Sequence, residues 1–138
     1  MSETKSKIVN ESKSQYAPAL GTRAAAIAYT KRNYMTKQEP AARGIDLTEV
    51  SKAVQYKSSV AASQAIVAQM EDKSDVGEYI AKMFKGPTGY EAFEVDVVET
   101  GHDKVDLEYH YCPLVKAWQE MGLSDEEIAQ LCDSAMVG

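Results

Sequence analysis

The residues best suited to chemistry lie near the C-terminus of the 138-residue chain, where Cys112 directly precedes Pro113 and His110 lies two positions earlier. Proline is typical of the first turn of a helix, so the Cys112 thiol is predicted at a helix N-terminus, whose dipole favours a thiolate. In an extended strand, His110 shares a face with Cys112 and could act as its base. A Cys–His nucleophile is one hypothesis. The alternatives are a small buried cysteine and a solvated histidine.

A second cysteine follows twenty residues later, as Cys132 beside Asp133. If the intervening residues form two antiparallel helices, Cys132 returns towards Cys112; otherwise it simply fills an apolar helix face. These residues and His110 could also ligate Zn²⁺, although their spacing is not the C-x₂-C pairing of structural zinc sites. We therefore expect no cofactor, and the alternative is a zinc site formed by His110, Cys112, Cys132 and Asp133.

Aromatic and acidic side chains surround this segment. The aromatic residues Tyr109, Tyr111 and Trp118 either line an organic ligand or pack the strands against the helices. An acidic ladder is either a solvated face or a site for a metal ion or a cationic substrate, and it consists of Glu94, Asp96, Asp106 and Glu108. The candidate catalytic residues are Cys112, His110 and Asp133, and the candidate substrate-binding residues are Tyr109, Tyr111, Trp118 and Cys132.

A β-hairpin is predicted to position these residues. After Gly89 the apolar period changes from helical to twofold, which favours strands from about residue 92 to 111, with a polar turn in between. The side expected to pack on helices consists of Phe93, Val95, Val97, Val105, Leu107 and Tyr109. Two short helices follow, and Ser124 and Glu127 form a capping box for the second. Helices before and after one hairpin indicate an α+β fold.

The first half of the chain is predicted to be helical. Residues 1–20 are polar and are expected to form a flexible arm. A helix is then expected from Thr22, as its cap, to Pro40, because alanine favours helices and a residue before proline does not.

Two further helices are expected before the hairpin. The longer one spans residues 47–71, starts at a capping box of Asp46 and Glu49, and is expected to be a central packing helix. Its stripe of apolar and small residues is Leu47, Val50, Val54, Ala61, Ala65 and Ala68. The shorter helix spans residues 75–85, is capped by Ser74, and is expected to stop at Gly86 and Pro87.

Composition restricts the functions that the chain can have. It carries 15 Lys and Arg against 21 Asp and Glu, a net charge of −6, which argues against binding to nucleic acids or anionic membranes. No apolar stretch is long enough to span a membrane, and the N-terminus does not resemble a secretory signal. Two cysteines are not a disulfide framework, so a cytoplasmic location is expected. The length fits a single domain, expected over residues 21–138.

Residues 90–134 resemble the L-2-amino-thiazoline-4-carboxylic acid hydrolase-like family. The resemblance is carried by a strand that runs into the Tyr-Cys-Pro of residues 111–113, a short helix, and the Cys-Asp of residues 132–133 in the next helix. It implies an α+β domain that adds water to a cyclic amidine, and thus a hydrolase of non-peptide C–N bonds in small carboxylate-bearing molecules.

The chemistry of such a reaction assigns roles to three residues. The Cys112 thiolate could attack the amidine carbon, His110 could move the proton, and Asp133 could hold the developing amidinium charge. Attack by a metal-bound hydroxide is the alternative. No basic residue is an obvious anchor for the substrate carboxylate, and the candidates in the helical half are Arg23, Arg32 and Arg43.

Domains of this family usually continue with further strands and another cysteine. We expect the chain to lack those C-terminal strands, and the alternative function is therefore a non-catalytic accessory subunit that keeps the fold. A lone hairpin leaves unpaired edge amides and is marginal in water. The expected partners are a small-molecule substrate and other subunits, in a homo-oligomer or a hetero-complex.

Overall fold

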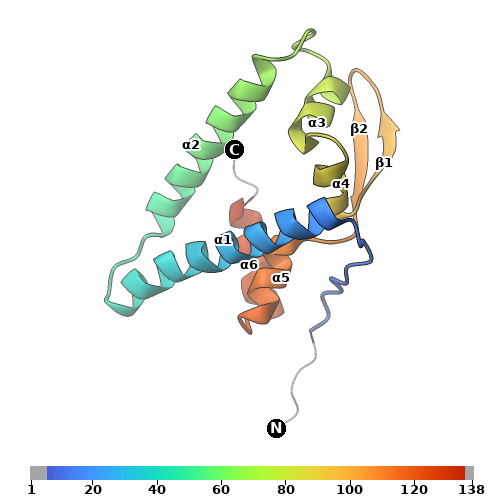
Figure 1. Cartoon of the computed structure of the whole chain (residues 1–138). Helices are drawn as coiled ribbons and strands as arrows, with labels where there is room; N and C mark the ends of the chain where they lie inside the picture. Colours follow the sequence, from blue (N-terminus) through green and yellow to red (C-terminus); the bar gives the residue numbers. More distant parts are fainter. Residues whose placement is uncertain (1–5, 136–138) are drawn as a thin grey trace.

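The computed structural model describes residues 6–135, which fold into six helices and one antiparallel pair of strands (Figure 1). The helices are α1 (Ala17–Ala42), α2 (Thr48–Val67), α3 (Val76–Phe84), α4 (Pro87–Phe93), α5 (Pro113–Glu120) and α6 (Asp125–Ala135). The strands are β1 (Val95–Thr100) and β2 (Val105–Tyr109). This order confirms the predicted α+β class: a helical first half, a hairpin and two short helices.

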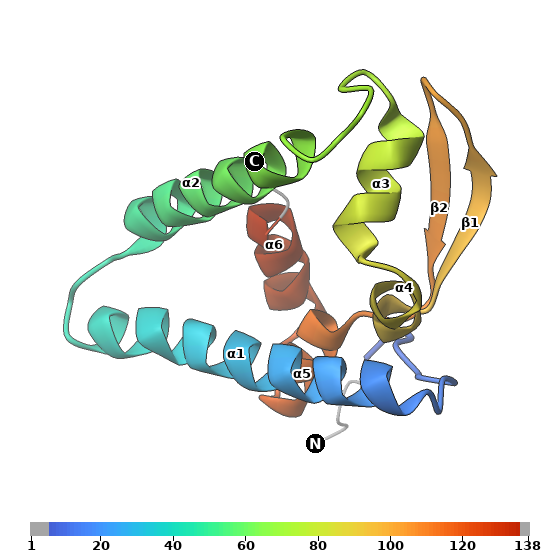
Figure 2. The same ribbon diagram turned by 45° about the horizontal axis from the view of Figure 1, so that its top comes forward.

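The packed part of the molecule forms where α1 lies against α4 and α5, with α6 folded back on α5 (Figure 2). Its apolar centre is the cluster of Val115, Trp118 and Ile128. Burial of each such side chain is worth about 1.5–3 kcal/mol. Because Val115 and Trp118 belong to α5, the same packing fixes the start of α5, which is where Cys112 lies.

The hairpin is shorter than the predicted 92–111, and its acidic face contains three of the four predicted residues, with Glu99 in place of Glu94. Asp96 lies opposite Glu108 in the register, and Glu99 lies opposite Asp106. The extra residue of a bulge, Val98, separates these two pairs and keeps the four carboxylates on one side of the sheet. On the other side Val95 is buried, while Val97 and Tyr109 are about half exposed.

The strand starts late because a short helix, α4, occupies residues that were predicted to be extended. Lys85 and Gly86 both have positive φ, which ends α3, and Pro87 then opens α4 instead of ending all helical structure. A side chain at Gly89 would lie 1.8 Å from the carbonyl oxygen of Phe84, so only glycine allows this close turn. Phe93 therefore belongs to α4 and not to the hairpin.

The first helix is longer at both ends than predicted. It begins at Ala17, with a proline in its first turn, and the Thr22 hydroxyl donates to the Pro18 carbonyl instead of capping. It also continues two residues beyond Pro40. A proline so close to a helix end removes one hydrogen bond of the last turn only, and both Arg43 and Ile45 donate to its carbonyl.

The prediction of α2 as a central packing helix is wrong. None of its residues is buried, and Val50 and Val54 are 56% and 61% exposed. α2 follows a loop after α1, diverges from α1 along its length, and has its main contact with α3 (Figure 1). The alanine-rich stripe allows a close approach but offers little apolar area to bury within this chain.

The helix caps agree with the prediction in one case of four, and the Thr22 cap described above is one of the exceptions. Ser124 and Glu127 exchange side-chain-to-backbone hydrogen bonds of 2.8 and 3.2 Å, which confirms the capping box of α6. α3 is capped by Asp75, and not by Ser74, through a bond from the Glu78 amide. Asp46 accepts both bonds of Thr48, so no capping box starts α2.

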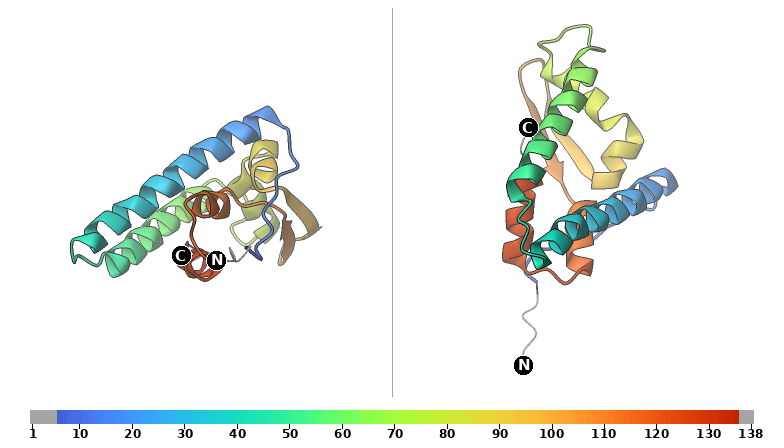
Figure 3. Two further views of the ribbon diagram at one scale, coloured as in Figure 1. Left: turned by 90° about the horizontal axis from the view of Figure 1, so that it is seen from below. Right: turned by 90° about the vertical axis from the view of Figure 1, so that its left-hand side faces the viewer.

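Residues 6–16 precede α1 as an extended segment that runs beside the hairpin towards α5 and α6 (Figure 3). Its backbone and side chains bind carboxylates of the folded domain, with Ser6 and Lys7 donating to Asp125 and the Lys13 amide donating to Glu94. Of the arm expected over residues 1–20, residues 17–20 are helical and residues 1–5 lie outside the described residues.

Candidate functional site

Cys112 caps α5, as predicted from the Cys-Pro pair. Its backbone is extended, Pro113 follows at the first helical position, and the thiol lies half-buried against the cluster of Val115, Trp118 and Ile128. Cys112 is therefore placed at the positive end of the helix dipole, on the side of α5 that faces the core.

Cys132 packs against the same cluster from α6, so the two short helices bring the cysteines into one neighbourhood. Burial raises the pKa of the Cys132 thiol, and the nearby Cys112 and Asp133 raise this pKa further. Both cysteines are free thiols. Asp133, the next residue after Cys132, is exposed.

Asn10 holds the backbone at Cys112 from the N-terminal segment. Its side-chain amide donates to the Cys112 carbonyl and accepts from the Cys112 amide, both at 2.9 Å. Ile8 packs on the apolar cluster, and Gln119 donates to the Ile8 carbonyl. The segment before α1 is thus part of the thiol environment, although 102 residues separate Asn10 from Cys112 and no local pattern indicated it.

Arg23 is a structural residue in this fold. It is only 4% exposed, and its guanidinium lies 4.4 Å from the centre of the Tyr111 ring. It donates to the Ala92 and Glu91 carbonyls and to Ser12, and forms an ion pair of 3.0 Å with Glu94. These contacts tie α1 to α4 and occupy the guanidinium of Arg23. The prediction that Glu94 belongs to the acidic ladder is therefore wrong, because its carboxylate pairs with Arg23.

The aromatic candidates divide into buried and accessible side chains. Trp118 and Tyr111 are each 6% exposed, which matches the packing alternative of the sequence analysis. Tyr109 is 53% exposed and packs edge-on against Phe93. Burial, followed by the nearby Cys112, raises the pKa of Tyr109, so its hydroxyl stays protonated near neutral pH.

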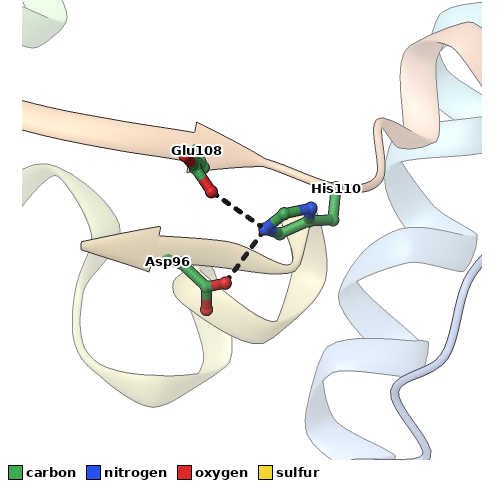
Figure 4. Close-up of side chains that lie close together, drawn as sticks. All are labelled: Asp96, Glu108 and His110. Atoms are coloured by element: carbon green, nitrogen blue, oxygen red, sulfur yellow. Dashed lines mark hydrogen bonds and ion pairs between the residues drawn. The ribbon is translucent and has the colours of Figure 1, made fainter. Parts of the chain in front are cut away.

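His110 faces the acidic side of the hairpin (Figure 4). Its Nε2 atom lies 2.9 Å from Oδ2 of Asp96 and 3.8 Å from Oε2 of Glu108. Within residues 6–135 no hydrogen bond joins His110 to Cys112. The His110 imidazole thus has two carboxylate partners. The sequence predicted that Asp96 and Glu108 belong to the acidic ladder, but it did not predict their contact with His110.

Comparison with known families identifies the chain. The sequence profile described as L-2-amino-thiazoline-4-carboxylic acid hydrolase matches residues 20–138. The chain belongs to this family. No curated protein and no solved structure matches the chain significantly. The family assignment supports a hydrolase-like protein and agrees with the Cys-Pro and Cys-Asp motifs that suggested it.

Two surface pockets lie elsewhere, where α2 approaches α3. One of about 340 Å³ is lined by the C-terminal half of α2 and Lys73, and a second of about 170 Å³ lies between Met70 and Tyr79. Neither pocket is lined by any of the candidate catalytic or substrate-binding residues. Among the described residues, no helix has the length and apolar character needed to cross a membrane.

Proposed function

We propose that the protein is a hydrolase that opens a cyclic amidine, or a related non-peptide C–N bond, in a small carboxylate-bearing molecule. The family match over residues 20–138 supports the reaction class. The observation that carries the proposal is the position of Cys112, at the start of α5 and beside a second thiol. Two free thiols fit a reducing cytoplasm, and the net charge of −6 does not favour nucleic acid as a partner.

The proposed reaction begins with attack of the Cys112 thiolate on the amidine carbon. A carbon–sulfur bond forms while the amidine electron pair moves to nitrogen, which takes a proton. The ring carbon–nitrogen bond then breaks, and its electron pair leaves with the ring nitrogen, which takes a second proton and departs as an amine. Water adds through its oxygen to the same carbon, the bond from this carbon to the Cys112 sulfur breaks, and the ring-opened carbonyl product and the free thiol result. His110 supplies and accepts protons, and Asp133 holds the amidinium charge.

The proposed substrate contacts fall into two groups. Tyr109 and Cys132 lie close enough to Cys112 to influence one another electrostatically, and Tyr109 is accessible to a ligand. Tyr111 and Trp118 support the site from the core side.

The test is incubation of the full chain with L-2-amino-thiazoline-4-carboxylate and mass-spectrometric detection of the ring-opened product. Cys112→Ser is expected to lower kcat/KM by about a thousandfold or more, as loss of a nucleophile does. Glu39→Gln, on the exposed end of α1, is the matched control and is expected to leave it unchanged. A Cys112→Ser protein with wild-type activity would exclude the thiol mechanism.

The second candidate function is an accessory subunit, and the exposure of α2 favours it. Exposed apolar side chains extend from the last turns of α1 through α2, among them Met35, Ile45, Val50, Val54 and Tyr56. Such a surface is typical of contacts between subunits. We propose that the chain works as an oligomer, and light scattering across micromolar concentrations tests this. A monomer throughout, together with hydrolysis by the isolated chain, would exclude the accessory function.

A further inference from the structure

We propose that Asp96, Glu108 and His110 form a binding site for a divalent metal ion of the zinc class. The proposal goes beyond hydrolysis by a thiol and does not depend on it. One ligand atom from each residue lies within 4.8 Å of the others, and within residues 6–135 this is the group of such ligands that the fold brings together.

The hairpin places the three side chains on one face. Asp96 and Glu108 are partners across the antiparallel strands. The His110 amide donates to the Glu94 carbonyl at 3.1 Å, which extends the ladder beyond β2. Glu108 and His110, two residues apart, therefore lie on the same side as Asp96 (Figure 4).

The spacing of the ligand atoms suits a small cation. Metal–ligand bonds of about 2.0–2.2 Å in a tetrahedral zinc site separate the ligand atoms by roughly 3.3–3.6 Å. The distances from His110 Nε2 to the Asp96 and Glu108 oxygens, 2.9 and 3.8 Å, lie on either side of this value. Small side-chain rotations therefore suffice to admit the ion.

A comparison within the hairpin indicates that this site needs a cation. Two carboxylates directly opposite each other on paired strands repel. At the other acidic pair, Glu99 and Asp106, the Lys104 ammonium lies 3.3 and 2.8 Å from the two carboxylates. At Asp96 and Glu108 the corresponding position holds an imidazole, which when neutral is a metal ligand.

The donor set selects the class of ion. One imidazole nitrogen with two carboxylate oxygens favours Zn²⁺ or a similar transition metal over Mg²⁺ and Ca²⁺, which prefer oxygen only. All three residues are exposed, so three protein ligands leave at least one position for water. A metal-bound imidazole nitrogen cannot accept a proton, so the proton-transfer role proposed above for His110 applies to the metal-free chain.

The experiment is calorimetric titration of Zn²⁺ into the chelator-treated full chain, with Co²⁺ absorption as a second readout. The chain carries Cys112→Ser and Cys132→Ser so that thiols cannot bind the ion. We expect one ion per chain, and at least tenfold weaker binding in each of Asp96→Asn, Glu108→Gln and His110→Gln. Glu99→Gln and Asp106→Asn are the matched controls and are expected to bind as the parent does.

Three results would overturn the proposal. These are no stoichiometric binding in the thiol-free chain, equal binding by the His110→Gln variant, and equal loss of affinity in the Glu99→Gln control. The five hairpin substitutions are all on its acidic face, the two Cys→Ser substitutions are common to every chain compared, and circular dichroism checks the fold of each variant. No substrate is present in the titration, so its outcome is independent of whether the chain hydrolyses an amidine.

Discussion

The region around α5 and the helix α2 both have apolar residues at helical spacing, but apolar and polar faces are clearly separated in α5 and only weakly separated in α2. Both present an apolar stripe at helical spacing. In α5 the stripe contains Val115 and Trp118, which are buried against α6, whereas in α2 it contains Val50 and Val54, which are exposed. Apolar residues at helical spacing therefore do not ensure a buried face, because the separation of apolar from polar residues, the size of the side chains and the available partners decide whether that face is buried in the same chain.

The largest expected effect is that of a core truncation in α5. Trp118→Ala is expected to lower the free energy of unfolding by about 3–5 kcal/mol, because it removes the largest side chain of the cluster and leaves a cavity. Val54→Ala in α2 is expected to change it by less than about 0.5 kcal/mol. Urea unfolding of both variants measures the contrast. A large loss in Val54→Ala would mean that α2 is buried in an assembly.

A second effect distinguishes two arginines of the same helix. Arg23→Met is expected to destabilise the protein by about 3 kcal/mol, because it removes the ion pair with the largely buried Glu94 carboxylate and the side-chain hydrogen bonds to two carbonyls. Arg43→Met, at the exposed end of α1, is expected to cost less than about 0.5 kcal/mol. The measurement is again urea unfolding, and equal losses in the two variants would contradict the structural role of Arg23.

Much of the fold follows from local sequence signals. The twofold apolar period predicted the hairpin, and the pair of Ser124 and Glu127 predicted the start of α6. Both features depend only on residues that are close in the sequence. α4 was missed because seven residues are too few to show a period and because Pro87 was interpreted as a stop. The surroundings of α2 were missed because they depend on which surface meets it, which no local pattern records.

The candidate site was predictable to a similar degree. Pro113 indicated that Cys112 starts a helix, and a helical hairpin indicated that Cys132 returns to it. The pairing of His110 with Asp96 required the register across the hairpin, including the bulge at Val98. The contact of Asn10 with Cys112 joins distant parts of the chain and has no sequence signature.

A third prediction concerns the two thiols that share the α5–α6 cluster. Cys112 is expected to be alkylated several times faster than Cys132, because burial raises the pKa of Cys132 and reduces its thiolate fraction at neutral pH. Iodoacetamide labelling of the native protein, followed by mass mapping, measures the ratio. If Cys132 reacts first, or if both react only after unfolding, the thiolate mechanism loses its support. Asn10→Ala, which removes the contact to the Cys112 backbone, tests whether the N-terminal segment controls this reactivity.

The smallest expected effect is a pH dependence at the link between the hairpin turn and the loop before α3. His102 binds Asp103 at 2.7 Å and Asp72 at 2.9 Å, and these hydrogen bonds raise the pKa of His102 to about 9. Because this pKa is above its ordinary value of 6.5, the stabilisation is complete below pH 6.5 and is lost as the pH rises to about 9.

Asp72 has the opposite pH dependence. Hydrogen bonds from Ser74 and then His102 lower its pKa to about 2, so its contribution to stability is lost only as the pH falls towards that value. In the parent chain this contact makes the free energy of unfolding fall between neutral and alkaline pH. In His102→Gln that fall is expected to be absent. The free energies of unfolding of the two proteins are subtracted at each pH. The contribution of the cysteine thiols is the same in both proteins and therefore cancels. Both side chains are exposed, so added salt is expected to reduce the difference. Identical pH profiles for the two proteins would mean that the packing of α3, rather than this exposed ion pair, holds the loop to the hairpin.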